Sequence, residues 1–337
     1  MKKNLFFYAM AFCLAVCNVA CGSDNEEDNN GNNNNGNNGK VIPAPVNAAN
    51  AVAYTIPSNA APAKNSDLIN KDGVHITASL TGINITESEK AIIEVTTKDD
   101  SGNTKLKYVT FDTELNGNIY TVKDGGKVIG KIEKKPASRT RGTSNVELVF
   151  NLKFTINSIT GVLEFVAEDP ITAKAMEEYI SNSNNLTSIA RTWKIDGMKL
   201  VLDFRDKSKT DASTTVETGG DLREFITLAD DNGVSLSEKD RADLSKTIES
   251  ITIDKNGQFT LTYEGRESDV ANWNWVSGSN ESKLQITLKD KDMGNKFLDN
   301  DSKIEVEYHP ETKTINLALT TYLQDDDCDA SLVISLY

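Results

Sequence analysis

Two tryptophans, Trp273 and Trp275, are spaced so that a β-strand would place both rings on the same face. The polar residues beside them are Asn272, Asn274, Ser277 and Asn280. Aromatic rings with amide and hydroxyl groups nearby can stack against a sugar and bind its hydroxyls, so this pair is a candidate ligand site. The alternative, which we favour, is that both rings pack in the core of a barrel wall.

The remaining chemistry-bearing residues predict no catalytic site, metal site or cofactor. His75 and His309 are too few and too far apart in sequence for a histidine zinc site or a catalytic triad. Acidic residues gather at 290–301 and 325–327, without the ligand spacing of a calcium loop. A glycosidase needs a pair of carboxylates, but no pair can be selected among 50 acidic residues.

One basic run interrupts this acidic chain, and it comprises Lys131, Lys134, Lys135, Arg139 and Arg141. Such a run can contact anionic lipid or polysaccharide. The interpretation that we favour is an exposed hairpin tip, because the sequence PASRTRGTSN that follows is typical of a surface loop.

The N-terminus has the pattern of a secretory signal, which we assign to residues 1–20. Lys2 and Lys3 precede a short apolar run at 5–17, and this run is shorter than the roughly 20 residues of a membrane-spanning helix. Val19-Ala20-Cys21 resembles the lipobox of bacterial lipoproteins, which implies that Cys21 is the lipid attachment residue. Cys17 is the alternative acceptor. Attachment of several acyl chains would hold the protein stably on a membrane.

The segment after Cys21 is predicted to be a flexible tether over residues 21–45. Residues 22–28, GSDNEED, resemble the acidic export signal of surface lipoproteins from Bacteroides-type bacteria, which implies lipid anchoring in the outer membrane and display on the cell surface. The alternative is that these acids only keep the tether in solution. Residues 29–39 are Asn and Gly alone and cannot bury a core.

Charge and cysteine content restrict the partners. The formal net charge is −14, and removal of residues 1–20, with two lysines and no acid, gives −16 over 317 residues. Nucleic acid is therefore an unsuitable partner, because phosphate binding needs clustered Lys and Arg. With Cys21 acylated, only Cys328 would remain, so no internal disulfide is expected; with Cys17 as anchor, Cys21 and Cys328 could pair.

Residues 46–168 are predicted to form an N-terminal antiparallel β domain. Strand-like segments lie at 74–80, 91–97, 106–111, 118–122, 127–132, 146–156 and 161–166, separated by turn sequences. Asp169-Pro170 then resembles a helix start, and apolar residues continue at helical spacing to Ile180. We therefore expect a connecting helix and linker over 169–186.

Residues 187–337 show the clearest alternation of apolar and polar residues. Strands are predicted around 198–204, 259–263, 273–275, 284–288, 304–308, 315–319 and 332–336. Helical patterns lie near 220–232 and 236–248, the second with a capping box at Ser235 and Glu238. Eight or nine such strands can close into a barrel.

The segments TSIARTWKIDGMKLVLDF, ITIDKNGQFTLTY, NWNWVSGSNESKLQITL, IEVEYHPETKTINLALTTYL and SLVISLY resemble, in this order, the lipocalin-like (calycin) domain of Bacteroides-type lipoproteins. The resemblance covers 187–337, and it departs from the family at Arg191-Thr192-Trp193, where the family has Gly-x-Trp. It implies a mainly β protein with two antiparallel β domains, the second a lipocalin-like barrel with a helical insertion.

These observations predict a cell-surface lipoprotein that acts as a non-enzymatic binding or accessory protein for a small apolar or glycan ligand. The ligand would be captured in the barrel mouth, since an eight-strand interior is filled by side chains or holds one small ligand. The alternative is a structural or assembly component of the cell envelope that docks another protein through a strand edge or the basic loop.

Overall fold

A computed structural model describes residues 51–135, 145–176, 184–205, 211–216, 219–231, 238–288, 302–323 and 328–337. Several predictions of the sequence lie outside these residues. They are the signal at 1–20, the tether at 21–45 with Cys21, the basic residues Arg139 and Arg141, and the acidic segments 290–301 and 325–327. The described part is mainly β-structure, as the sequence predicts.

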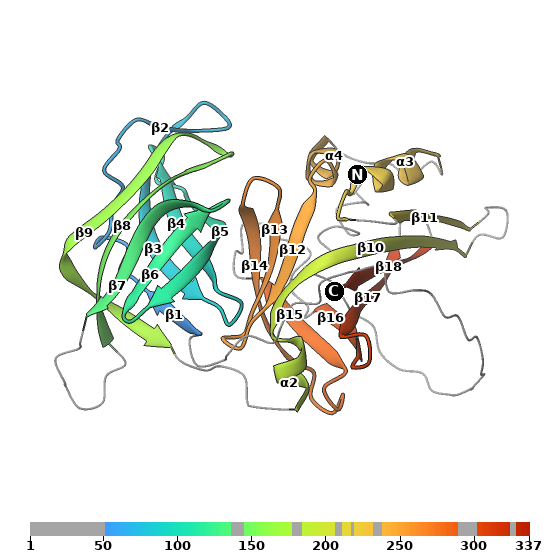
Figure 1. The fold of residues 1–337 in the computed structure, drawn as a ribbon. Helices are drawn as coiled ribbons and strands as arrows, with labels where there is room; N and C mark the ends of the chain where they lie inside the picture. Colours follow the sequence, from blue (N-terminus) through green and yellow to red (C-terminus); the bar gives the residue numbers. More distant parts are fainter. Residues whose placement is uncertain are drawn as a thin grey trace.

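The N-terminal half forms a closed ring of antiparallel strands, on the left in Figure 1. Its strands are β1 (Val52–Thr55), β3 (His75–Ile85), β4 (Lys90–Asp99), β5 (Thr104–Asn116), β6 (Ile119–Asp124), β7 (Lys127–Lys135), β8 (Asn145–Ile156) and β9 (Ile159–Met176). Each neighbour in the order 3-4-5-6-7-8-9-1 pairs with the next, and β1 pairs back with β3. The short β2 (Leu68–Asn70) adds to β3 and β9. We call this unit the N-terminal ring.

The C-terminal half forms a second closed ring, on the right in Figure 1. Its strands are β10 (Arg191–Phe204), β12 (Ile248–Ile253), β13 (Gln258–Tyr263), β14 (Glu267–Trp275), β15 (Lys283–Leu288), β16 (Ser302–His309), β17 (Thr314–Leu323) and β18 (Cys328–Leu336). Pairing runs in the order 10-12-13-14-15-16-17-18 and returns to β10. We call this unit the C-terminal ring.

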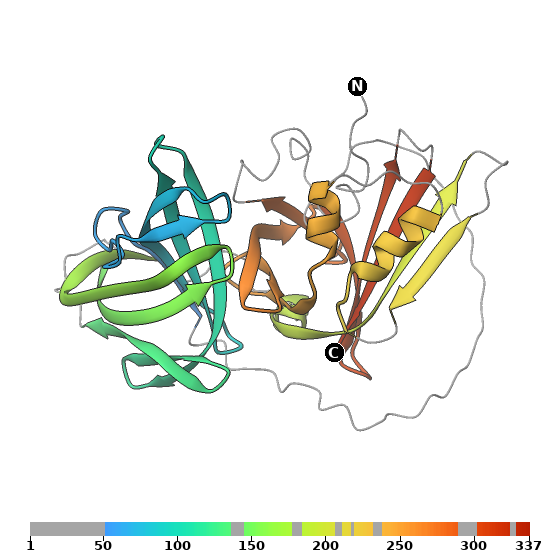
Figure 2. The ribbon, with the colours of Figure 1, turned by 90° about the horizontal axis from the view of Figure 1, so that it is seen from above.

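Three helices and one further strand accompany the C-terminal ring. Helix α2 (Asn184–Ile189) precedes β10, and strand β11 (Ala212–Val216) pairs with β10. Helices α3 (Arg223–Asp231) and α4 (Glu238–Leu244) lie between β11 and β12 in the chain. Figure 2 shows α3 and α4 on the side of the C-terminal ring seen from above. Among the described residues, no helix is both long and apolar enough to cross a membrane.

Each ring has its own apolar core, built from the inward positions of alternating strands. The N-terminal core contains a chain of phenylalanine rings, with Phe154 packed 5.3 Å from Phe111 and 5.8 Å from Phe165. The C-terminal core surrounds Trp193, whose indole N–H donates to the Ile189 carbonyl of α2 at 2.9 Å. The interior positions are therefore occupied by side chains in both rings.

The sequence predicted most of these strands but was wrong about the helix expected to begin at Asp169. Residues 169–176 belong to β9, with Ala173 and Ala175 buried and Lys174 exposed between them, which is the period of a strand. Pro170 lies where the pairing of β9 with β8 shifts register, between Ala167 and Ile171. A β-bulge tolerates proline because the ladder is interrupted there.

Other differences concern short strands with little apolar alternation. The alternation of apolar and polar residues does not predict β1, β2, β11 or β12, and it does not predict that the N-terminal half closes into a ring. Closure of an antiparallel barrel is confirmed for the C-terminal half, with β11 as an additional strand.

Strands β7 and β8 lie unusually close together at Gly130, so we expect a side chain at this position to lower stability. A Cβ atom at Gly130 would overlap the carbonyl oxygen of Asn151 on β8, so a side chain there forces the strands apart. Gly130→Ala should lower the free energy of unfolding by about 1 to 3 kcal/mol, the usual cost of overpacking. Urea denaturation would measure this, with the exposed Lys127→Ala on the same strand as a control expected within about 0.5 kcal/mol of wild type. Equal stability of both variants would contradict the close approach.

Candidate functional site

Trp273 and Trp275, the ligand candidates from the sequence, pack against the C-terminal core. Trp273 is 3% exposed, and its indole N–H donates to the Asp254 carbonyl at 2.9 Å. Its ring meets Trp275 edge-on, with centroids 5.4 Å apart and an interplanar angle of 86°. Trp275 is partly buried against the same core. The arrangement matches the core-packing alternative, because the Trp273 ring is not open to a ligand from solvent.

The other candidates remain dispersed. His75 is exposed on β3, whereas His309 on β16 contacts Asn316 at 3.2 Å and Glu307 at 3.6 Å. Of the basic run, Lys135 pairs with Glu133 at 2.6 Å on β7. Within the described ranges, no group of three or more His, Cys, Asp or Glu residues is placed to hold a metal ion.

The two rings meet through a short strand pairing. Strand β5 is longer than its ring neighbour β6, which pairs only with residues 112–116. On the N-terminal side of residue 112, β14 of the C-terminal ring pairs with β5 instead of β6. Glu267 lies opposite Val109, and Ser268 lies opposite Tyr108. The hydroxyls of Thr110 and Ser268 lie 2.8 Å apart and are buried. The place where β14 meets β5 is visible between the two rings in Figure 1. We call the contact between the rings the seam.

Burial along β3 shows how far the seam extends. Every residue from Thr81 to Glu87 is buried, although a strand with one wet face would alternate. Ile83 and Ile85 belong to the N-terminal core. Asn84, on the opposite face, contacts the turn between β12 and β13, residues 254–257. The end of β3 is therefore buried on both faces, by its own ring and by the other.

Asn84 is the centre of a buried polar network across the seam. Its amide group donates to the Asp254 carboxylate at 2.6 Å and to the Gln258 side-chain oxygen at 2.7 Å. Its side-chain oxygen accepts a hydrogen bond from the Asn256 amide at 2.8 Å. Asn84, Asp254 and Asn256 are all nearly inaccessible to solvent. Buried polar groups are stable only when paired, so these bonds fix one placement of the end of β3 against the turn at 254–257.

Asp254 also holds its own turn in shape. Its carboxylate accepts the Gln258 backbone N–H at 3.0 Å, and its carbonyl accepts the Gly257 N–H at 3.2 Å as well as the Trp273 indole. Trp273 thus connects the C-terminal core to the turn that faces Asn84. Trp273 therefore helps to hold the turn that forms one side of the seam.

Glu87 is the second buried carboxyl at the seam. It is 2% exposed, and its Oε1 atom accepts the Lys255 backbone N–H at 2.7 Å. Its Oε2 atom is buried and has no hydrogen-bond partner among the described residues. Burial, and then the negative charge of Asp254, raise the pKa of Glu87 to about 7 from its ordinary value of 4.5.

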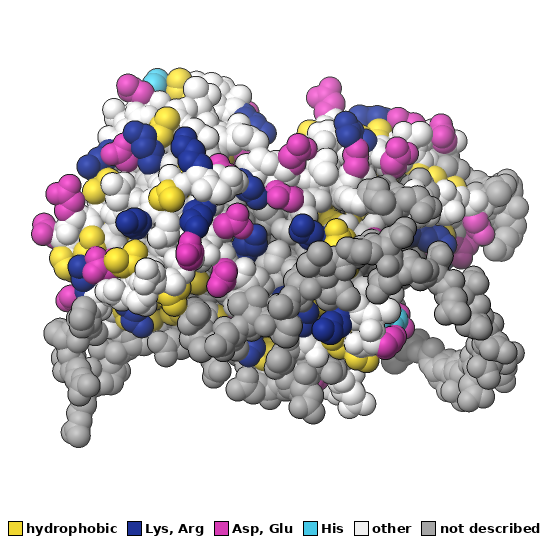
Figure 3. Space-filling model, in the orientation of Figure 1, with side chains coloured by type: hydrophobic (Ala, Val, Ile, Leu, Met, Phe, Trp, Pro, Cys, Tyr) yellow, Lys and Arg dark blue, Asp and Glu magenta, His cyan; other side chains and the backbone are white. Residues whose placement is uncertain are grey.

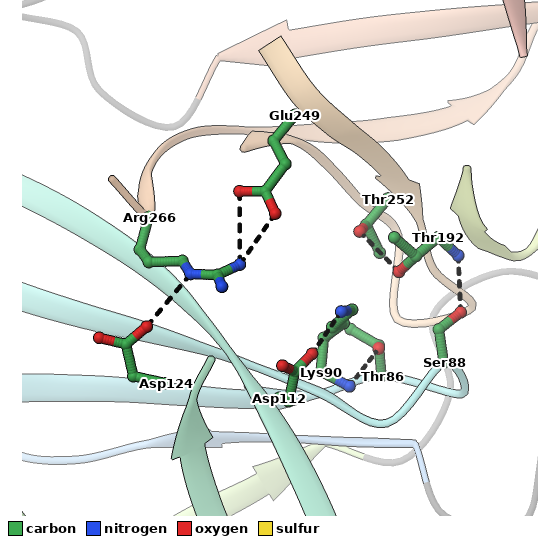
Figure 4. Close-up of polar contacts among 9 residues, drawn as sticks. All are labelled: Thr86, Ser88, Lys90, Asp112, Asp124, Thr192, Glu249, Thr252 and Arg266. Carbon is green, nitrogen blue, oxygen red and sulfur yellow. Dashed lines mark hydrogen bonds and ion pairs between the residues drawn. The ribbon is translucent and has the colours of Figure 1, made fainter. Parts of the chain in front are cut away.

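More exposed polar contacts continue the seam, as Figure 4 shows. Arg266 lies between Asp124 of the N-terminal ring at 3.3 Å and Glu249 of the C-terminal ring at 3.1 Å. The Ser88 hydroxyl accepts the Thr192 backbone N–H at 2.6 Å. Exposed ion pairs contribute little, so the buried network is the stronger contact.

A small groove lies beside the network, lined by residues of β1, β3, β4 and β5 of the N-terminal ring and by Gln258 of the C-terminal ring. Its volume is about 70 Å³, and it is lined by backbone and side chains that include Gly82, Asn84, Glu94, Tyr54, Tyr108 and Gln258. The Glu94 side chain lies over Gly82, where an added Cβ would be 3.1 Å from the Glu94 Cβ and 3.4 Å from its carboxylate. The carboxylate accepts the Thr81 hydroxyl at 2.9 Å. Glu94 is the one ionisable carboxylate in this lining. The groove is too small for a drug-sized ligand, whose pockets are roughly 300 Å³ or more.

Comparison with known proteins gives no family. No family model matches the chain, and no curated protein matches it. A solved structure of a protein of unknown function from the DUF3598 family of Nostoc punctiforme is 7% identical, covers 86% of this chain and 96% of its own, and has a TM-score of 0.20. Transferrin Binding Protein B of Haemophilus parasuis is also 7% identical, with 78% and 53% covered and a TM-score of 0.22. At these scores the similarities carry no argument about function.

The seam is absent from the predictions made from the sequence. Sequence reasoning missed it because Asp254, Asn256 and Gly257 form an ordinary hairpin-turn signal, and nothing local indicates that the turn is buried by another ring. Asn84 lies between Ile83 and Ile85, which is the ordinary alternation of a strand and does not indicate that its polar face is buried.

Asn84→Ala tests the network. The change removes three side-chain hydrogen bonds and leaves buried groups of Asp254, Asn256 and Gln258 without this partner. We expect the free energy of unfolding to fall by about 2 to 4 kcal/mol. Asn103→Ala, in an exposed turn where Asn103 also bonds a carboxylate, is the control and should cost less than about 1 kcal/mol. Equal losses in urea denaturation would show that the seam contacts contribute nothing beyond ordinary surface bonds.

Proposed function

We propose that the protein is a cell-surface lipoprotein, anchored in the outer membrane through acylated Cys21, that binds a glycan without catalysing a reaction. Its folded part consists of two domains. The first, expected at 46–168, extends to Met176 because β9 belongs to the N-terminal ring, and the second is 187–337 around the C-terminal ring. The second is a lipocalin-like barrel with a helical insertion between β11 and β12. The tether at 21–45 separates this body from the lipid.

The observation that supports binding at the surface is the polar lining of the groove at the seam. One carboxylate, Glu94, lies there together with the side-chain amide of Gln258. Carboxylate and amide groups bind sugar hydroxyls, and the volume of about 70 Å³ admits part of one sugar at the end of a glycan. An apolar ligand is less suitable, because apolar core side chains already occupy the interior of each ring.

The anchor is tested by substitution of the acceptor cysteine. Cys21→Ala should release the protein from membranes into the soluble fraction, because several acyl chains supply the whole membrane affinity. Cys17→Ala is the matched control and should leave the protein membrane-bound. Fractionation followed by immunodetection measures both. Release by Cys17→Ala alone would assign the anchor to Cys17, and protection of the protein from protease added to intact cells would exclude surface display.

Glu94→Gln tests the groove. The variant keeps an oxygen acceptor for Thr81 but removes the charge, so affinity for a bound glycan should fall roughly tenfold, as for loss of a charge-assisted hydrogen bond. Binding of the detergent-solubilised full chain to a glycan array would measure this. Glu114→Gln, an exposed carboxylate paired with Lys123 on the same ring, is the control and should bind as wild type does.

Absence of binding to any glycan by a folded protein would favour the second candidate, a docking component of the cell envelope. The observation behind that candidate is β11, which pairs with β10 on one side and with no other strand in the described part of the chain. A strand with a free edge can accept a strand from another protein.

A further inference from the structure

The turn between β3 and β4, residues 86–90, is docked on the C-terminal ring through two side chains. Glu87 accepts the backbone N–H of Lys255, and Ser88 accepts the backbone N–H of Thr192. Within the turn, the Thr86 hydroxyl accepts the Lys90 N–H at 3.2 Å, as drawn in Figure 4. The docking thus depends on two acceptor atoms of adjacent residues that contact two different segments of the other ring.

We propose that Glu87 is a proton-linked latch between the rings. With its carboxyl group neutral, the turn at 86–90 remains docked on the turn at 254–257. With the carboxyl group ionised, the docking is weakened and the turn at 86–90 separates from the turn at 254–257, which the Asn84 network still holds against β3. This inference does not depend on the ligand proposed above.

The surroundings of Glu87 suit a neutral carboxyl group better than a charged one. Its Oε2 atom is buried and lacks a hydrogen-bond partner among the described residues, and an ionised carboxylate left so is costly. The negative charge of Asp254, which is fully buried, also disfavours the ionised form of Glu87. Two buried carboxylates in one site resist joint ionisation.

Positive charges near the turn do not offset this. Lys255 attracts the carboxylate, but its effect on Glu87 is the smallest of those acting there. On the turn itself, Glu89 is exposed and Lys90 pairs with Asp112 at 2.5 Å. From β10, Arg191 lies over the Trp193 ring, 4.9 Å from its centroid. Each of these groups is either engaged elsewhere or acts weakly on Glu87.

The direction of the pH dependence follows from linkage. Burial and Asp254 raise the pKa of Glu87 from 4.5 to about 7, so the docked state binds the proton more tightly than an undocked, solvated carboxyl. The stabilisation is fully present below about pH 4.5 and is lost as pH rises through 7. The latch would therefore weaken across the neutral range.

The remaining seam contacts allow the turn to separate without separation of the rings. The pairing of β5 with β14 and the Thr110–Ser268 contact involve backbone and hydroxyl groups that do not titrate. A small apolar cluster of Ile92, Tyr108 and Val270 also joins the rings. These contacts would keep the rings together while the Glu87 end opens.

Hydrogen exchange of the detergent-solubilised full chain tests the latch. The peptides containing Lys255 and Thr192 should lose protection by about tenfold or more between about pH 5.5 and about pH 8.5, after correction for intrinsic exchange. In Glu87→Gln, which keeps an acceptor oxygen and cannot ionise, protection should stay constant over this range. Glu114→Gln, an exposed carboxylate of the same ring, should behave as wild type does.

Constant protection in wild type, or an equal loss in Glu87→Gln, would overturn the proposal. A second measurement covers the case in which Glu87→Gln does not fold. Carbon NMR of unsubstituted protein with labelled glutamate should then show one carboxyl group that titrates near pH 7. Titration of every glutamate near 4.5 would reject the latch equally.

Discussion

The seam between the rings depends on a difference in length between neighbouring strands. A closed ring offers no free edge, so two rings can share a strand pairing only where one of them is incomplete. β5 spans Thr104–Asn116, whereas β6 covers only residues 112–116 of it, which leaves backbone groups at Tyr108 and Val109 for β14. The same arrangement occurs on β10, which pairs with β12 at residues 191–194 and with the extra strand β11 at residues 198–202. Backbone groups left by a short neighbour need partners, and here the other ring or an extra strand supplies them.

A strand pairing of only two residues does not by itself fix how the two rings are placed against each other. The buried polar network fixes this placement. The Asn84 side chain donates hydrogen bonds to Asp254 and to Gln258, and it accepts one from Asn256. A shift of one ring against the other would leave these groups buried and unpaired, which costs more than the bonds themselves contribute. An apolar contact such as that of Ile92 with Val270 has no comparable directional requirement.

Alternation of apolar and polar residues predicted the strands that bury one face, such as β10 and β17, because each inward side chain leaves a period of two in the sequence. The same rule failed for the segment after Asp169, where an Asp-Pro pair imitates a helix start but lies in a bulge of β9. The seam could not be predicted, because pairing of Asn84 with Asp254 joins residues 170 positions apart. Glu87 lies in TESEK, a segment that by composition belongs on a surface. Its burial results from the other ring, and no local pattern records it.

The latch and the groove act on the same contact. Asn84 lines the groove and lies three residues before Glu87, and Gln258, which also lines the groove, directly follows the turn that Glu87 contacts. A ligand that contacts both Glu94 and Gln258 spans the two rings, so it would bind more tightly when a neutral Glu87 holds them in contact. By linkage the converse must hold with the same coupling free energy: the bound ligand would raise the pKa of Glu87 further. Proton and ligand would then be positive effectors of one another, because both stabilise the arrangement in which the turn at 86–90 is docked on the turn at 254–257.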